Sequence, residues 1–300
     1  MTAPPAPRDA VYPVGIVGVG NMGGAMAANL LARGWTVHVH DLDASKTRNL
    51  EPFGAIPSAS GTQLATKSEA VIVCVVDAAQ TEDVLFGPQG VLAGLRPGCT
   101  VLLCPTIAPA DVEHFAGRLA RSGVHAIDAP MSGGPARARD GTMSLMVACA
   151  DAVFEANRRL IAALSNQVFR ISERPGDGAR TKLVNNLLAG INLVGAAEAL
   201  ALAERLGLDP AATLAVIEQS SGQSWIGTDR LRRALSGDLA PRAHMTLLAK
   251  DTRMAVQAGA QAGFTGPLGA ATRDAFAAAC AGGLADRDDG ALLQWLLQQR

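Results

Sequence analysis

An apolar stretch that runs directly into a glycine-rich turn most constrains the fold of this chain. Residues 12–17 read as a buried parallel strand, and glycines follow at positions 18, 20 and 23. In such a G-x-G-x-x-G pattern the first glycine permits a tight turn, the second lets the backbone approach a pyrophosphate, and the third allows close helix packing. The next helix then faces the phosphates with the positive end of its dipole. The predicted cofactor-binding residues of this turn are Gly18, Gly20, Asn21, Met22 and Gly23.

A second predicted strand, residues 35–40, ends in Asp41. An acidic residue about 20 positions after the glycines binds the ribose hydroxyls of a bound dinucleotide. Its carboxylate would repel the 2'-phosphate of NADP, so Asp41 favours NAD, while Lys46 and Arg48 nearby leave NADP open. The alternative role for Asp41 is a helix cap within DLDAS.

Further apolar runs at residues 70–76, 100–104 and 124–127 alternate with amphipathic segments, and strands are also expected at 142–148 and 167–171. This alternation predicts an α/β fold, a Rossmann-type doubly wound parallel sheet. Ligands of such sheets bind beyond the carboxyl ends of the strands. We therefore expect Val75, Val76 and Thr106 to line the nicotinamide end of the site, with a plain turn as the alternative for Thr106.

A second glycine-rich segment, DAPMSGGPARARDGTMSLM, begins at Asp128. Ser132, Gly133 and Gly134 follow the end of a predicted strand, and successive backbone amides there would suit an anion such as a carboxylate. The alternative is a connector between strands. Arg137 and Arg139 fit either the mouth of a cleft or a solvated loop.

Residues 176–208 have a helical composition with no proline before Pro210, and apolar residues occupy nearly every face. We expect a central helix that is buried on all sides. Lys182, Asn185, Asn186 and Ala189 share one face of it. Buried polar groups require polar partners. The polar partner of these side chains would be a substrate. The alternative is that Lys182 reaches water and the asparagines bond to neighbouring helices.

The expected domains are a disordered tail at 1–11, a dinucleotide-binding domain at 12–174 and an all-α domain at 175–300, since no strand is evident after residue 175. Trp225, in SSGQSW, either packs in the core or covers a substrate. Asp288 or Asp289 is expected to cap the final helix. The long helix is too apolar for a monomer surface, which predicts a homodimer or homotetramer.

Composition and charge weigh against several classes of protein. The net charge of −1 argues against a nucleic-acid partner. Asn192, Glu198 and Glu204 interrupt the longest apolar helix, so no membrane span is expected. Five cysteines, an odd number, are typical of a reduced, cytoplasmic protein. The scattered histidines lack metal-site spacing, so no metal is expected.

Three segments together resemble the beta-hydroxyacid dehydrogenase family, which includes 3-hydroxyisobutyrate dehydrogenases, tartronate semialdehyde reductases and L-threonate dehydrogenases. GVGNMGGAMAANL is similar to the cofactor motif of the family, DAPMSGGPARARDGT to its substrate motif and GDGARTKLVNN to its catalytic motif. The resemblance spans nearly the whole chain after the tail. It implies a Rossmann domain joined through the long helix to a helical domain, with the active site between them.

The resemblance also implies roles for individual residues. Lys182 would be the catalytic lysine, and Asn186 and the loop of residues 132–134 would hold the substrate carboxylate. Thr106 would lie beside the cofactor, and Lys250 would reach the cofactor from the helical domain. The implied reaction is hydride transfer between NAD(P) and the hydroxyl carbon of a small, 3-hydroxyisobutyrate-like 3-hydroxy acid, with Lys182 as general acid and base.

The substrate stays open among the members of this family. Pro105 stands where the family usually has serine, and Arg137 where glycine is common. VVDAAQTEDVLFGPQG and SSGQSW resemble the threonate branch, whereas KLVNN is typical of the hydroxyisobutyrate and semialdehyde branch. The alternatives are an L-threonate-type aldonate dehydrogenase, a tartronate or succinic semialdehyde reductase, and a non-catalytic NAD-binding protein. Lys182 argues against an imine reductase, and the histidine-bearing motif of phosphogluconate dehydrogenases is missing from this sequence.

Overall fold

The computed structural model describes residues 11–238 and 240–299, which divide into two compact units between Lys182 and Leu183. The division falls inside one long helix, α8 (Asp177–Arg205), so that Lys182 ends the first unit and Leu183 begins the second. The predicted all-α domain starts earlier, at residue 175. Of the predicted tail at 1–11, only Val11 lies among the described residues.

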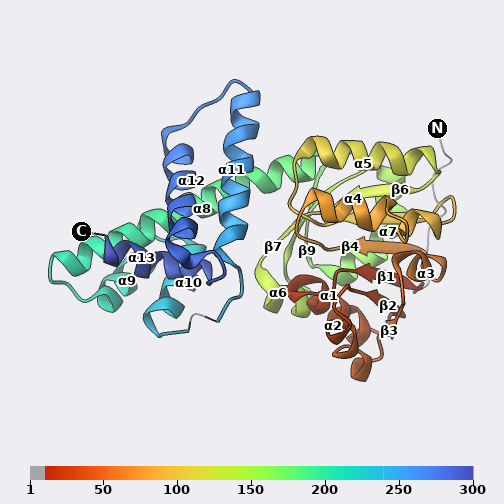
Figure 1. The fold of residues 1–300 in the computed structure, drawn as a ribbon, viewed down its shortest axis with the longest axis horizontal. Helices are drawn as coiled ribbons and strands as arrows, with labels where there is room; N and C mark the ends of the chain where they lie inside the picture. The colour runs from red at the N-terminus through yellow and green to blue at the C-terminus, as the bar shows by residue number, and fades with distance from the viewer. Residues whose placement is uncertain (1–10, 239, 300) are drawn as a thin grey trace. The chain divides into compact units, whose positions relative to one another are not determined.

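The first unit contains one nine-stranded sheet in the order β3-β2-β1-β4-β5-β6-β8-β7, with β9 paired to β8 (Figure 1). Strands β1 to β6 run parallel to one another. Strand β8 runs antiparallel to β6 and β7 and parallel to β9. The doubly wound α/β fold is thereby confirmed. The strands are β1 (Val14–Val17), β2 (Val37–His40), β3 (Ile56–Pro57), β4 (Ala70–Val73), β5 (Thr100–Leu103), β6 (His125–Asp128), β7 (Met131–Ser132), β8 (Ser144–Ala148) and β9 (Gln167–Ser172).

Alternation of side chains along the strands supplies a hydrophobic core on each face of this sheet. Ile16 and Ile72 pack with α1 and α7 on one face, while Val17 and Val73 pack with α3, α4 and α5 on the other. The helices of the unit are α1 (Asn21–Ala32), α2 (Ala44–Arg48), α3 (Gly61–Thr66), α4 (Ala78–Phe86), α5 (Pro109–Arg121), α6 (Gly134–Asp140) and α7 (Asp151–Leu164), with 3₁₀ turns η1 (Glu51–Phe53) and η2 (Val91–Ala93).

The described residues of the second unit form helices joined by turns and loops, as predicted for an all-α domain. Its core surrounds Phe276, which is fully buried. A Cβ atom at Gly190 of α8 would lie 2.7 Å from a methyl of Thr252 and 3.3 Å from the Phe276 ring, so this glycine lets α8 pack closely on α11 and α12. The elements after α8 are α9 (Pro210–Glu218), α10 (Trp225–Leu235), α11 (Met245–Gln261), α12 (Pro267–Ala279), the π-helical turn η3 (Cys280–Leu284), η4 (Asp289–Ala291) and α13 (Leu292–Gln298).

Helix α8 is not buried on all sides, so that prediction is wrong for the single chain. Val184 is 71% exposed, and Leu188 and Leu202 are each 58% exposed. The helix is also long and apolar enough to cross a membrane by length and composition alone, contrary to the expectation that its polar residues would prevent this. The burial of an apolar helix cannot be inferred from its composition, because an apolar face can form an interaction surface as well as pack in a core.

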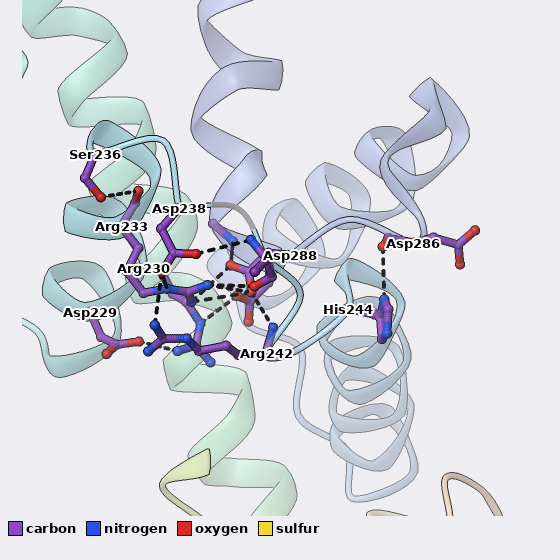
Figure 2. Close-up of polar contacts among 12 residues, drawn as sticks. Asp229, Arg230, Arg233, Ser236, Asp238, Arg242, His244, Asp286 and Asp288 are labelled. Atoms are coloured by element: carbon purple, nitrogen blue, oxygen red, sulfur yellow. Dashed lines mark hydrogen bonds and ion pairs between the residues drawn. The ribbon is translucent and has the colours of Figure 1, made fainter. Parts of the chain in front are cut away.

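A buried ionic network ties the C-terminal segment of the second unit to the connection between α10 and α11 (Figure 2). Asp288 is fully buried and accepts hydrogen bonds from the Arg242 amide at 2.9 Å and the Gly290 amide at 3.1 Å, with the Arg233 guanidinium 3.4 Å away. Burial alone would raise the pKa of Asp288, but these donors outweigh it and hold the pKa below its ordinary value. Asp288 therefore caps η4, whereas α13 has no side-chain cap, which corrects the predicted cap of the final helix.

Several short elements of the first unit, among them β3, β7 and α6, were not predicted. The glycine-rich segment after Asp128 contains both the short strand β7 and the helix α6, rather than an irregular connector. All five cysteines lie among the described residues and are free thiols. Within residues 11–238 and 240–299, no group of three His, Cys, Asp or Glu side chains is arranged to hold a metal ion.

Candidate functional site

The turn between β1 and α1 has the geometry that a bound pyrophosphate requires. Gly18 has a φ of +86°, and a Cβ there would lie 2.4 Å from the carbonyl oxygen of Cys74. A Cβ at Gly23 would lie 1.9 Å from the carbonyl oxygen of Gly18, so α1 can start close to β1 only with glycine at this position. At Gly20, in contrast, a Cβ would meet nothing within 4 Å. The turn thus leaves open space beside its central glycine, which fits the residues to a dinucleotide. Asn21 and Met22 form the first turn of α1.

Asp41 connects this turn to the end of β2. Its Oδ2 atom accepts a hydrogen bond from the Val19 amide at 2.9 Å, and its Oδ1 atom accepts one from the Asp43 amide at 3.0 Å. The Nζ atom of Lys46 lies 3.5 Å from Oδ1. Asp43, not Asp41, caps α2. A hollow of about 550 Å³ adjoins Asp41 and is also lined by Arg48, so the carboxylate faces open space at the expected end of the strand.

The predicted nicotinamide-side residues follow the neighbouring strands β4 and β5. Val75 is partly buried, Val76 is 50% exposed and Thr106 is partly buried. The Val76 amide donates to Oε1 of Gln80 at 3.1 Å, which fixes the turn into α4. Because β4 and β5 are parallel and in register, their following turns lie at the same edge of the sheet as Gly18.

The predicted substrate loop follows β6 at the same edge. Ser132 lies in β7, paired with Ser144, and Gly133 and Gly134 have φ values of +125° and +75°. A Cβ at Gly134 would meet nothing within 4 Å, whereas one at Gly133 would lie 2.9 Å from the Arg137 side chain. The loop therefore exposes backbone that only glycine can supply in this conformation.

Lys182 lies on α8 and is only 7% exposed, although it is a charged residue type. Asn186 follows one turn later on the same face of the helix and is 8% exposed. Asn185, by comparison, is exposed, and its Nδ2 atom donates to Oδ1 of Asn186 at 3.0 Å. Of the polar face predicted on this helix, Lys182 and Asn186 are thus the buried pair.

In the second unit, Asn186 belongs to a buried polar group on α8 and α11. Its Nδ2 atom donates to Oδ2 of Asp251 at 2.6 Å, and Nζ of Lys250 lies 3.2 Å from Oδ1 of the same carboxylate. Asp251 is 5% exposed. The amide of Asn186 is therefore fixed on both sides, by Asn185 and by Asp251. Trp225 lies at the start of α10 and is 53% exposed, so it is no core residue within the chain.

Asp128, the last residue of β6, is a second buried carboxylate, 1% exposed. Its Oδ2 atom accepts hydrogen bonds from the backbone amides of Gly176 and Ala179, at 2.8 and 3.0 Å. Burial raises the pKa of Asp128 to about 6, although amide hydrogen bonds from Ala179, Gly176 and Gly178 oppose this, and the negative charge of Asp177 adds to the rise.

This raised pKa predicts how stability depends on pH. The folded protein binds the proton of Asp128 more tightly than the unfolded chain, so the contribution is full below pH ~4 and is lost as the pH rises through about 6. A change from 3.8 to about 6 corresponds to roughly 3 kcal/mol. The thiols of Cys104 and Cys149 also face this carboxylate, but burial raises their pKa values well above this window.

Urea unfolding at pH 4.5 and 7.5 measures the effect, with Asp128→Asn as the reference that cannot titrate. The free energy of unfolding of the wild type, relative to the variant, should fall by about 2 kcal/mol between these pH values. An equal difference at both pH values would mean that Asp128 titrates in its ordinary range.

Asp128 and Asp251 are the residues that sequence reasoning missed. Each is brought to its partner by the fold, across 48 residues for Asp128 and Gly176 and 65 residues for Asp251 and Asn186. A local signal existed for both: Asp128 ends a predicted strand directly before the glycine loop, and Asp251 follows Lys250.

Comparison with known proteins identifies the family of this chain. Residues 13–172 match the family model of the NAD binding domain of 6-phosphogluconate dehydrogenase. Residues 176–296 match the model described as NAD-binding of NADP-dependent 3-hydroxyisobutyrate dehydrogenase. The two models together cover nearly all of the chain, and both describe binding of a nicotinamide dinucleotide.

Individual relatives extend over the same length. L-threonate dehydrogenase of Cupriavidus necator is 36% identical over 281 residues, 94% of this chain and 95% of the relative. 3-Hydroxyisobutyrate dehydrogenase of Pseudomonas aeruginosa is 37% identical over 212 residues, 71% of each chain. The crystal structure of 3-hydroxyisobutyrate dehydrogenase from Salmonella typhimurium superimposes with a TM-score of 0.89 at 33% identity, covering 95% of this chain and 99% of the other. This chain belongs to the beta-hydroxyacid dehydrogenase family, NAD(P)-dependent oxidoreductases that act on the CH–OH group of hydroxy acids.

Proposed function

We propose that Lys182 is the general acid and base of this dehydrogenase and that Asn186 and the 132–134 loop bind the carboxylate of the hydroxy acid. The observation that carries the proposal is the burial of Lys182, 7% exposed, one helical turn before an equally buried Asn186 whose amide is fixed by Asp251. A buried amine beside a fixed amide is an arrangement suited to proton transfer on a held substrate.

In this mechanism the bound nicotinamide supplies or accepts the hydride. The Lys182 amine accepts the hydroxyl proton when the substrate is oxidised and returns it when the carbonyl is reduced. As an ammonium, Lys182 also stabilises negative charge on the substrate oxygen. The amides of Gly133 and Gly134 and the Asn186 carboxamide hold the carboxylate and fix the position of the reacting carbon. Thr106, Val75 and Val76 would line the nicotinamide, Lys250 would contact the cofactor, and Trp225 would cover the substrate.

For the substrate we favour a small aldonate of the L-threonate type, because the full-length relative from Cupriavidus necator is an L-threonate dehydrogenase. A 3-hydroxyisobutyrate-like acid is the second candidate, favoured by the family model over residues 176–296. Absorbance of the reduced nicotinamide, with NAD or NADP and a panel of L-threonate, 3-hydroxyisobutyrate, tartronate semialdehyde and succinic semialdehyde, tests the proposal. Failure to turn over any member would contradict it.

Cofactor preference can be tested at Asp41. We expect the wild type to prefer NAD, and Asp41→Ala to raise the KM for NAD about tenfold while the KM for NADP falls, because the variant loses ribose hydrogen bonds and a repulsive charge. Asp43→Ala is the matched control: it removes a neighbouring carboxylate that only caps α2. An unchanged NAD to NADP ratio in Asp41→Ala would exclude this role.

We further propose that the chain self-associates, as a homodimer or homotetramer, and that it is a soluble, cytoplasmic protein without a nucleic-acid partner. Large apolar side chains of the second unit support self-association, since Val184, Phe264 and Leu268 are 71%, 65% and 61% exposed. Exposed apolar surface of this kind is typical of subunit interfaces. Light scattering measures the mass of the assembly.

A further inference from the structure

Asp128 joins the end of β6 to the first turn of α8. Its Oδ2 atom accepts the Gly176 amide at 2.8 Å and the Ala179 amide at 3.0 Å, and the side chain is 1% exposed. The first amides of a helix have no partner within the helix and need an acceptor from outside it. A carboxylate is a strong acceptor there, because it also interacts with the positive end of the helix dipole.

The glycines before Lys182 are explained by this contact. A Cβ at Gly178 would lie 2.9 Å from the Asp128 carboxylate carbon and 3.0 Å from the carbonyl oxygen of Met146. Gly176 has a φ of +102°, which side chains other than glycine rarely adopt. The GDG segment at the start of α8 therefore lets the helix approach the Asp128 carboxylate closely.

A helix transmits its starting position to the residues that follow. Lys182 is the sixth residue of α8, so it lies only about 7.5 Å along the axis from Asp177. Because this separation is short, a displacement of the first turn would displace Lys182 by about as much as the turn itself moves. Asp128 also precedes Ser132 by four residues, so the same strand end leads into the 132–134 loop.

The choice of a carboxylate costs stability. Burial raises the pKa of Asp128 to about 6, so near pH 7 the side chain is ionised in a place that disfavours its charge. A neutral Ser or Asn could accept the same amides without that cost. Residues that lower stability relative to a simpler alternative are typical of functional sites.

We propose that Asp128 is a positioning residue for the reaction: it clamps the first turn of α8 to the end of β6 and so fixes Lys182 relative to the 132–134 loop. This inference rests on the proposed role of Lys182. It assigns no contact with substrate or cofactor to Asp128 itself.

Four variants separate the contact of Asp128 with α8 from other effects. Asp128→Ala removes the acceptor, and Asp128→Asn keeps one acceptor oxygen. Asp177→Asn is the matched control, because Asp177 places a second carboxylate in the same first turn, and among the described residues that carboxylate bonds to the side chains of Ser172, Arg174 and Arg180. Leu160→Ala, on the buried face of α7, controls for a general loss of stability.

With a substrate from the panel, Asp128→Ala should lower kcat about 10- to 100-fold, the effect expected of a small misplacement of a catalytic group. The KM for NAD should change less than twofold, and the deuterium isotope effect with labelled substrate should rise as hydride transfer becomes slower. Asp128→Asn should recover part of kcat. Asp177→Asn and Leu160→Ala should leave kcat per folded enzyme and the isotope effect unchanged.

Hydrogen exchange of peptides covering 176–183, and the rate at which acetic anhydride acetylates Lys182 relative to Lys250, test the clamp without turnover. Both rates should change at least fivefold in Asp128→Ala and stay constant in Asp177→Asn. Unchanged rates, or changed rates with wild-type kcat, overturn the inference. If the wild type turns over nothing, the proposed function fails separately, and the exchange and labelling rates still decide whether Asp128 positions Lys182.

Discussion

Replacing Lys182 with alanine should lower kcat by about 10²- to 10⁴-fold, the range that one positioned proton-transfer group contributes. Lys182 is only 7% exposed on α8, so few other groups can take over its proton transfer. The affinity for NAD should stay within about threefold of the wild type, because the cofactor turn at Gly18 to Gly23 is unchanged. Steady-state kinetics with the substrate found on the panel, together with NAD titration by fluorescence, measures both quantities.

Two controls make this result specific. Lys67→Ala removes another lysine, an exposed one at the end of α3, and should leave kcat unaltered. Added methylamine should restore part of the activity of Lys182→Ala, since a small amine can enter the space of the missing side chain. A kcat within threefold of the wild type in Lys182→Ala would assign the proton transfer to another group.

The fold of the first unit could be predicted because its signals are local. A strand, a glycine turn and a helix follow one another within residues 14–32, and Gly18 and Gly23 each permit a close contact, with the residue after the adjacent strand β4 and within the turn itself. The parallel strands are short apolar runs, which differ clearly from the amphipathic helices between them. Strands β3 and β7, of two residues each, are too short to give any such periodicity.

The burial of α8 could not be predicted, because composition reports how apolar a helix is and not what covers it. Val184 and Leu188 alternate with Lys182 and Asn186 along the sequence. Val184 and Leu188 are exposed, yet Lys182 and Asn186 are buried. The apolar residues were expected to be inside and the polar ones to require explanation. The helix has the opposite arrangement at this point, which is what a site for a polar ligand requires.

The sequence predicts only those residues of the candidate site that belong to short motifs. Lys182, Asn186 and the 132–134 loop stand in such motifs, and their roles stay predictions until they are tested. The partners that fix them were missed because a hydrogen bond such as that of Asp251 with Asn186 joins residues 65 positions apart. No local pattern encodes that distance, although an acidic residue directly after Lys250 is a local sign of a charged pair.

The second large effect is expected at the cofactor turn, where Gly23→Ala should unfold or strongly destabilise the first unit, by about 3 kcal/mol or more, and abolish NAD binding. The added Cβ would lie 1.9 Å from the Gly18 carbonyl oxygen, and a backbone atom cannot move aside as a flexible side chain does. Thermal unfolding and NAD titration measure the two effects.

Gly20→Ala provides the matched comparison, since its Cβ would meet nothing within 4 Å and its φ of −67° is accessible to alanine. Stability should stay within about 0.5 kcal/mol of the wild type. NAD affinity should nevertheless fall at least tenfold, because the methyl group would occupy the space through which a pyrophosphate approaches the backbone amides. Unchanged NAD affinity in a stable Gly20→Ala would mean that the open space beside Gly20 does not receive the phosphates. Loss of NAD affinity with retained stability in Gly20→Ala would mean that the two glycines serve different purposes. Gly23 would be needed for the packing of α1, and Gly20 for the approach of the cofactor.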